Sequence, residues 1–289
     1  MWTETVITEG PYRFESVLHR LTLDPLNQID LEANTIRIPM YVHNHKQVVT
    51  IKGVGTIEAP EFEVTSDQYK EETLNEVARI FQWNVSLKEM AKHFEATNIA
   101  KLAKDHEGTP LVLDMNPYLS LLKCIIHQQL NMSFAFTLTK RLVQTYGEEV
   151  DGVWFYPLPE KVASLAYSEL RDMQFSQRKA EYVIDTSRLL AEGQLSLDEL
   201  VTMNDEEIQE KLMKIRGIGQ WTIQNLLLFG FGRQNLFPKA DIGIQNAIKK
   251  HFNLDQKPTY EQMDELSKGW SPYLSYASLY LWRSLETKQ

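Results

Sequence analysis

The spacing of hydrophobic and polar residues changes near residue 66. Between residues 12 and 63 apolar residues recur at every second position, most clearly in the runs 36–42 and 48–54, which predicts a small antiparallel sheet. Pro39 lies inside the first run and cannot donate to a strand ladder, so an edge or a bulge is expected there. Residues 43–45 (His-Asn-His) are expected to form the hairpin turn rather than a metal site, because no acidic or cysteine residue accompanies them at ligand spacing.

From residue 66 onward apolar residues recur at intervals of three and four, which predicts helices to the end of the chain. Asn204 precedes three acids and offers an N-cap for a helix running to Ile215. Further helices are expected at residues 74–81, at 87–94, in a pair over 117–146 around Asn131, from Pro159, over 178–192 before Gly193, and from Asp198.

Composition describes an ordinary globular chain. Its 289 residues are 43% hydrophobic and 24% charged, and we expect two domains. No apolar run approaches the length of about 18 residues that a membrane span needs, and the first residues lack an export pattern, so a cytoplasmic location is expected. The single cysteine, Cys124, excludes an intrachain disulfide, a four-cysteine zinc site and a cysteine-ligated iron–sulfur cluster.

The net charge of −9 argues against a uniformly basic nucleic-acid-binding surface. The charge is distributed unevenly, however, because the segment from Lys211 to His251 holds seven lysines and arginines and only one acid, Asp241. A basic run of this kind is equally compatible with a solvated face. The glycines within the segment therefore decide how it is interpreted.

Residues 216–222 (Arg-Gly-Ile-Gly-Gln-Trp-Thr) combine two glycines, spaced one apart, with flanking amphipathic helices. Such a turn brings backbone N–H groups against an anion without interference from side chains. Asp241 follows at the end of the segment 237–241 (Phe-Pro-Lys-Ala-Asp). A carboxylate close to bound phosphates would be repelled, unless it acts on positive charge that forms during a reaction.

Together with three other segments, these residues resemble the helix-hairpin-helix DNA glycosylase superfamily, and most closely its AlkA-type 3-methyladenine glycosylases. The likeness spans roughly residues 80 to 285. The other segments are 125–130 (Ile-Ile-His-Gln-Gln-Leu), 176–182 (Ser-Gln-Arg-Lys-Ala-Glu-Tyr), and 270–273 (Trp-Ser-Pro-Tyr) ahead of a last helix with Trp282.

The resemblance implies an α+β, mostly α fold. A small amino-terminal antiparallel sheet domain (1–75) would precede a helical glycosylase domain (76–289). That domain would comprise two all-helical lobes, 115–235 and 76–114 with 236–289, with the active-site cleft between them. The protein would be a monomer that acts on double-stranded DNA with damaged bases and not on membranes.

The resemblance also assigns roles. Asp241 would be the catalytic carboxylate at the start of the helix 242–250; the alternative is a plain N-cap, which aspartate also favours, and both roles can hold together. Trp221, Trp282 and Asn225 would line the pocket for a base swung out of the duplex, against the alternative that the tryptophans are core residues. Asn225, Arg283 and Leu274 depart from the family, which has aromatic residues at the first two positions and arginine at the third.

Further roles concern DNA binding. Gln129 and Leu130 would wedge into the minor groove, or Gln129 would merely cap a turn between helices. At the hairpin Gly217, Ile218 and Gly219 would hold a phosphate while Thr222 caps the second helix. The carbonyls of Met213, Ile215 and Ile218 would bind a structural sodium or potassium ion, and no other cofactor is expected.

Trp221 occupies the position at which lyase-competent members of the superfamily carry a nucleophilic lysine. The expected enzyme is therefore a monofunctional hydrolase, which releases alkylated or deaminated purines and leaves the abasic site uncut. Two alternatives remain: a non-catalytic protein that recognises damage on the same scaffold, and an 8-oxoguanine-type glycosylase, which the missing lysine disfavours.

Overall fold

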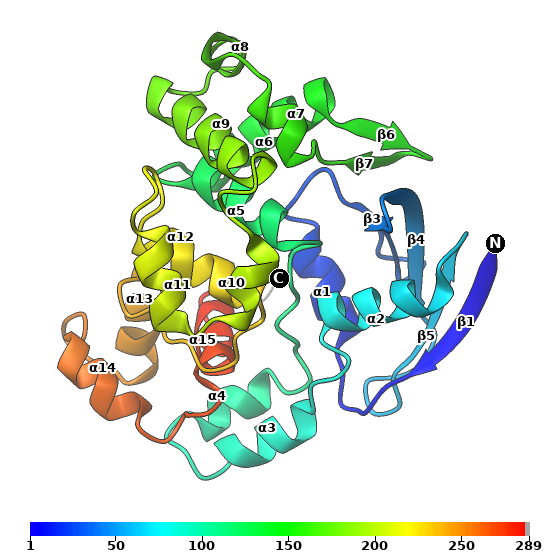
Figure 1. Ribbon diagram of the computed structural model, residues 1–289. Helices are drawn as coiled ribbons and strands as arrows, with labels where there is room; N and C mark the ends of the chain where they lie inside the picture. Colours follow the sequence, from blue (N-terminus) through cyan, green and yellow to red (C-terminus); the bar gives the residue numbers. More distant parts are fainter. Residues whose placement is uncertain (287–289) are drawn as a thin grey trace.

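The computed structural model describes residues 1–286 as an antiparallel sheet beside a larger helical body (Figure 1). The five strands lie in the order β1-β5-β4-β3-β2. Their bounds are Trp2–Ile7 for β1, Gln28–Asp30 for β2, Thr35–Val42 for β3, His45–Gly53 for β4 and Glu61–Ser66 for β5. The expected mostly helical α+β fold with an amino-terminal sheet is confirmed.

The central hairpin of the sheet follows the predicted alternation. Every second residue of β3 is buried, and its register with β4 runs without a bulge from Thr35 to Val42. Within residues 1–286, β2 pairs with β3 only as far as Arg37, so Pro39 lies where the outer edge of β3 has no partner strand. His43 and Asn44 form the turn with positive φ angles of 48° and 63°, and the His43 imidazole lies 3.2 Å from Glu72.

Helix α1 and strands β1, β6 and β7 were not predicted from the sequence. Helix α1 (Phe14–Leu21) interrupts the region assigned to strands, although its buried Phe14, Val17 and Leu18 follow the helical period. Strand β1 was missed because only alternate residues are half-buried and one of them is Glu4. The lobe after residue 115 is not entirely helical, since β6 (Glu148–Val150) and β7 (Val153–Phe155) form a short ribbon against β3.

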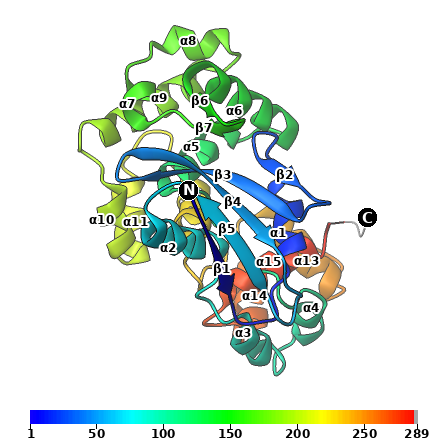
Figure 2. The same cartoon turned by 90° about the vertical axis from the view of Figure 1, so that its right-hand side faces the viewer.

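One hydrophobic core joins the sheet to part of the helical body. Buried Ile36 and Val64 of the sheet belong to the same cluster as Ile80 and Phe81 of helix α2 (Lys70–Phe81) and Tyr276 near the carboxyl end. Figures 1 and 2 show α1 and α2 between the sheet and the helical body. The helices of this body are α3 (Leu87–Phe94), α4 (Ala100–Asp105), α13 (Ile242–His251), α14 (Tyr260–Ser267) and α15 (Leu274–Arg283).

A second cluster holds the other lobe together and shares no buried residue with the first. Two backbone bonds of the connecting segment join the lobes, from the Leu113 amide to the Ile80 carbonyl and from the Asp114 amide to the Phe229 carbonyl. The helices of this lobe are α5 (Pro117–His127), α6 (Met132–Tyr146), α7 (Pro159–Ala163), α8 (Tyr167–Asp172), α9 (Gln177–Ala191), α10 (Leu197–Thr202), α11 (Asp205–Leu212) and α12 (Gln220–Asn225), which continues as a π-helical turn, η1 (Leu226–Gly230).

Local side-chain caps fix where several helices begin. Asn204 accepts a hydrogen bond from the Glu207 amide and forms a capping box, and Ser176 caps α9 in the same manner. Helix α11 ends at Leu212 and not at Ile215 as predicted, because the Ile215 amide bonds to the Leu212 carbonyl in a tighter turn. Within residues 1–286, none of these helices has the length and apolarity to cross a bilayer.

Candidate active site

Gly217 and Gly219, the two glycines between α11 and α12, lie in different structural environments. Gly217 has a φ of +94°, and a Cβ added there would lie 2.3 Å from Cγ of Tyr182. Any side chain at 217 would therefore be strained and would collide with the Tyr182 ring. Gly219 has an ordinary φ of −112° and open space where its Cβ would be. Packing requires glycine at 217, whereas at 219 glycine keeps the approach to the backbone open.

The hairpin exposes backbone donors and is tied to α5. Within residues 1–286, the amides of Gly217 and Gly219 donate to no protein acceptor. Gly219 is the N-cap of α12, so the prediction that Thr222 caps this helix was wrong. Thr222 is buried in the first turn, where its hydroxyl accepts a 2.6 Å hydrogen bond from Gln128 Nε2, which also donates to the Gly217 carbonyl at 2.9 Å.

The turn between α5 and α6 presents Gln129. Its φ is +56°, a left-handed conformation that is costly for a residue other than glycine, and its side chain is exposed. Leu130 is half-buried against the core of this lobe. Lys179 stabilises this turn, because its ammonium donates to the carbonyls of Ile125 at 3.1 Å and Gln128 at 2.7 Å. Burial lowers the pKa of Lys179 to about 8.

Asp241 is the N-cap of α13, as predicted, and one of its carboxylate oxygens is fully engaged. Oδ1 accepts hydrogen bonds from the Ile244 amide and from the indole Nε1 of Trp282, each at 2.9 Å. Within the described chain Oδ2 has no protein donor. The cap and the catalytic assignment are therefore compatible, because they use different oxygens of the same carboxylate.

Gly243 makes the approach of Trp282 to Asp241 possible. A Cβ at this position would lie 2.9 Å from Asp241 Oδ1 and 3.1 Å from Cδ1 of Trp282. Contacts this short force a neighbouring group to move. The glycine in the first turn of α13 thus leaves room for the indole to reach the carboxylate.

A cavity of about 1120 Å³ brings the predicted residues together. Its wall includes residues from both lobes and from the loop after α1, so the predicted cleft between the lobes is confirmed. Ten predicted site residues line it: Asp241, Trp221, Trp282, Asn225, Gln129, Leu130, Gly217, Ile218, Gly219 and Thr222. Met213 and Ile215 lie outside it on the hairpin.

The aromatic part of the wall holds Phe229 in addition to the two predicted tryptophans. Trp282 is half-buried beside Phe229, with ring centroids 6.2 Å apart and planes inclined by 30°. Phe229 reaches the wall from the π-helical turn η1, and such turns are frequent at functional sites. Trp221 is 41% exposed in α12. The Asn225 amide is turned back to the Trp221 carbonyl at 2.8 Å, which leaves its oxygen as the polar atom for the cavity.

Two of the departures from the family pattern are also placed. Arg283 lines the cavity and is mostly buried, with its Nε lacking any hydrogen-bond partner among residues 1–286. Leu274 begins α15 and packs, half-buried, against the core that includes the sheet. An arginine at position 274 would place a charge against that apolar cluster.

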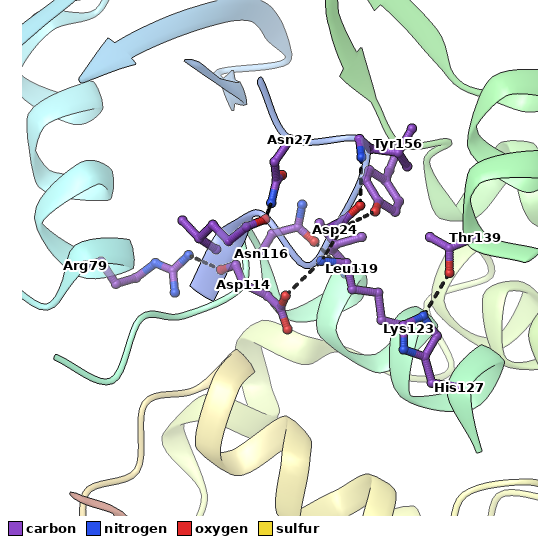
Figure 3. A network of polar contacts seen from close by, with 12 residues as sticks. Asp24, Asn27, Arg79, Asp114, Asn116, Leu119, Lys123, His127, Thr139 and Tyr156 are labelled. Carbon is purple, nitrogen blue, oxygen red and sulfur yellow. Dashed lines mark hydrogen bonds and ion pairs between the residues drawn. The ribbon is translucent and has the colours of Figure 1, made fainter. Parts of the chain in front are cut away.

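Part of the cavity lining is polar: Asp24, Asp114 and Lys123 belong to the network of contacts drawn in Figure 3. Lys123 lies between Asp24 and Asp114, 3.2 Å from Asp24 Oδ2 and 3.1 Å from Asp114 Oδ1, and Tyr156 donates to Asp24 at 3.0 Å. Burial alone would lower the pKa of Lys123, but attraction to Asp114 and Asp24 raises this pKa well above its usual value. The lysine is thus held charged and paired, and is unsuited to act as a nucleophile.

His127 continues this polar wall (Figure 3). Its Nε2 lies 2.9 Å from the Thr139 hydroxyl, which itself donates to the Ala135 carbonyl, so the histidine is the donor of the pair. Burial, with repulsion from the neighbouring Lys123, lowers the pKa of His127 to about 4. The imidazole is therefore neutral at physiological pH.

Comparison with known proteins agrees with this geometry. Residues 122–272 match the HhH-GPD superfamily of base excision DNA repair proteins, and this match includes the hairpin and Asp241. The chain belongs to that superfamily. The predicted resemblance is confirmed.

Individual relatives of this HhH-GPD protein cover it to different extents. A Bacillus subtilis protein named "Putative DNA-3-methyladenine glycosylase YfjP" is 55% identical over 289 residues, 99% of this chain and 100% of the relative. A second Bacillus subtilis protein, "DNA-3-methyladenine glycosylase", is 36% identical over 56% of this chain and 54% of its own length. The solved 3-methyladenine DNA glycosylase of Archaeoglobus fulgidus shares the fold, with a TM-score of 0.86 over 99% of both chains at 19% identity.

Sequence reasoning missed several residues of the HhH-GPD site. Asp24 is distant in sequence from Asp114 and Lys123, and the three side chains meet only through packing, so no local pattern marked them. Arg20 and Phe229 also line the cavity, and neither was predicted from the sequence. Gly243 gave a usable signal, because a glycine two residues after an N-cap weakens a helix and calls for a packing reason.

Proposed function

We propose that the protein is a monofunctional DNA glycosylase that swings alkylated purines out of double-stranded DNA and hydrolyses their N-glycosidic bond. Asp241 carries this proposal. Its Oδ1 is fixed by Ile244 and Trp282, and its Oδ2 is left for substrate or water beside an aromatic wall. The names of the Bacillus subtilis relatives agree with the alkylated purine as substrate.

The chemistry follows from where charge develops. Breaking the bond between the sugar and the base leaves positive charge on the deoxyribose, and a fixed carboxylate at that position stabilises the transition state. The same carboxylate can orient or deprotonate the attacking water. A purine alkylated at N3 or N7 is cationic and already a good leaving group, so a single carboxylate and aromatic faces suffice. Stacking against Trp221 and Trp282 would hold the extruded base.

DNA would be held on either side of the cavity. The free amides of Gly217 and Gly219 would bind a backbone phosphate, and Gln129 with Leu130 would fill the gap left by the extruded base. The left-handed backbone of Gln129 supports this role, because strain of this kind persists where the surrounding structure fixes it for function. The carbonyls of Met213, Ile215 and Ile218 would supply neutral oxygen ligands to a sodium or potassium ion at the hairpin.

The enzyme would leave the abasic site uncut. Trp221 offers no amine at the position of the lyase nucleophile, and Lys123, the cavity's own lysine, is held by two carboxylates. We further propose that the protein acts as a monomer in the cytoplasm, where the DNA is. Borohydride trapping tests whether the enzyme lacks lyase activity, since a lyase would form a covalent adduct with DNA.

The deciding experiment is chromatography of the bases that the purified protein frees from duplex DNA treated with dimethyl sulfate. Release of 3-methyladenine is expected, and Asp241→Asn is expected to abolish release while binding of an abasic-site duplex stays within about threefold of wild type. Retarded complexes without free base would favour the non-catalytic damage-recognition protein. Normal release by the Asp241→Asn variant would refute the assignment of the carboxylate.

A further inference from the structure

Arg20 is a cation in the cavity wall, and none of the acceptors in the described residues 1–286 binds it. It lies in the last turn of α1, its side chain is exposed, and it lines the same cavity as Asp241. Within residues 1–286 its guanidinium makes no hydrogen bond and no ion pair. Although solvent reaches the side chain through the cavity, the surrounding wall desolvates it and lowers the pKa of Arg20. Glu286 and Asp114 oppose this shift from outside ion-pair distance, and Arg283 adds to it. A guanidinium carries five donors in a fixed plane, so several of them are free to meet a ligand.

The Arg20 guanidinium is positioned by an aromatic contact. It stacks over Phe229 at 5.9 Å from the ring centroid, Phe229 lies 6.2 Å from Trp282, and Trp282 bonds to Asp241. A continuous series of contacts therefore runs from Arg20 to the carboxylate. The planar group lies on the wall against which an extruded base would stack.

We infer that Arg20 is a specificity-determining residue that binds the keto edge of an extruded neutral purine. This inference rests on the proposed function. Hypoxanthine, the deaminated form of adenine, presents O6 and N7 as adjacent acceptors, the pattern that an arginine fork contacts with two hydrogen bonds in guanine. The 3-methyladenine base presents an amino donor in place of O6, so it offers the fork a single acceptor.

The charge of Arg20 supplies a second reason. A cationic alkylated purine leaves as a neutral molecule, whereas a neutral purine leaves with negative charge on its ring. A fixed guanidinium beside the ring stabilises that negative charge as the bond to the sugar breaks. Toward a cationic base the same group is repulsive. Arg20 thus assists the poor leaving group selectively.

The test compares two substrates with two variants. Arg20→Lys keeps the positive charge but loses the planar fork, and Arg20→Met removes both. Hypoxanthine release is measured from a duplex with one deoxyinosine, and 3-methyladenine release from dimethyl-sulfate-treated DNA with the same protein preparation. Arg171→Lys, at an exposed helix position outside the cavity wall, controls for the substitution itself. Thermal melting verifies that each variant is folded.

The wild-type protein is expected to release both bases. In Arg20→Lys the ratio of hypoxanthine to 3-methyladenine release should fall about tenfold or more, the scale of discrimination by one bidentate contact, and in Arg20→Met it should fall further. An equal loss on both substrates would overturn the inference, because a phosphate contact or a structural role acts uniformly. Absence of any loss, or a wild-type protein that releases 3-methyladenine but no hypoxanthine, would also overturn it and leave the proposed function intact. A protein that releases neither base would refute the proposed function itself.

Discussion

Trp282 donates its indole N–H to Asp241, and both residues depend on Gly243 for their closeness. The bond restricts the rotation of the carboxylate and, within residues 1–286, leaves Oδ2 without a protein donor. Trp282→Phe keeps a ring but removes the donor. Because hydrogen bonds to charged groups are worth about 1.5–3 kcal/mol, the rate of base release should fall about 10- to 100-fold. Single-turnover kinetics measure this fall.

A matched control is available for the Trp282 variant. Trp270 donates its indole N–H to Asn98 at 2.6 Å and is fully buried away from the cavity. Trp270→Phe should therefore lower the melting temperature without lowering the single-turnover rate of the folded protein. If both variants lost activity in proportion to their loss of stability, the Trp282 bond would have no special part in catalysis.

Gly243→Ala should separate stability from activity. The new methyl would meet Asp241 and Trp282 at 2.9 and 3.1 Å, so both side chains must shift. Alanine also gains up to about 1 kcal/mol of helix propensity, which offsets part of the strain. We expect a free energy of unfolding within about 1 kcal/mol of wild type and a release rate at least tenfold lower, on the order of one lost charged hydrogen bond. A release rate within twofold of wild type would contradict this prediction.

The two hairpin glycines form a natural pair for mutation. Gly217→Ala puts a side chain at a φ of +94° against Tyr182, so the protein should lose about 1–3 kcal/mol of stability. Gly219→Ala meets no atom and should cost less than about 1 kcal/mol. Its methyl should nevertheless obstruct a phosphate and weaken binding of an abasic-site duplex about tenfold. Thermal melting and fluorescence anisotropy distinguish the two effects, and unchanged DNA affinity in Gly219→Ala would exclude the phosphate role.

Gln129→Gly tests the wedge. Glycine adopts the φ of +56° without strain, so the folded protein should be at least as stable as wild type by urea denaturation. Loss of the side chain should slow release from duplex DNA, where the gap needs filling, more than release from single strands. The ratio of the two rates is the readout. Equal slowing on both substrates would indicate that Gln129 acts at the chemistry and does not fill the helix.

His127 predicts a stability that depends on pH. Its folded pKa of about 4 lies below the unfolded value near 6.5, so the unfolded state binds more protons between these values. The stabilisation is complete above about pH 6.5 and is lost as the pH falls toward 4, at most about 3 kcal/mol. Urea denaturation between pH 7 and 4.5 measures it, and His127→Gln should flatten the slope. An equal slope in the variant would assign the effect to other groups.

Local signals explain which parts could be predicted from sequence. Asp241 could be predicted from its immediate neighbours, because an acid just before a helix is recognisable as a cap. The glycines of the hairpin likewise indicate a turn. The strand alternation of β3 and the cap at Asn204 are equally local. These features need no knowledge of the rest of the chain.

The remainder depended on packing. Lys123 forms ion pairs with Asp24 and Asp114. Asp24 is far from the other two residues in sequence, so no local pattern predicts that the three meet. A π-helical turn such as η1 has no sequence signature that distinguishes it from α-helix, so the place of Phe229 could not be foreseen. Helix α1 could have been predicted, because its apolar residues follow the helical period. The prediction of strands throughout this region was wrong there.

The sheet shares a hydrophobic core with α2, α13 and α15, so it supports the helix that begins after Asp241. Deleting residues 1–66, which hold the five strands and α1, would uncover Val77, Ile80 and Phe81 to water, and the shortened chain would be prone to aggregate. It would also lose Arg20 and Asp24 from the wall of the cavity. Removal of this segment would therefore take away part of the hydrophobic core and part of the cavity wall together.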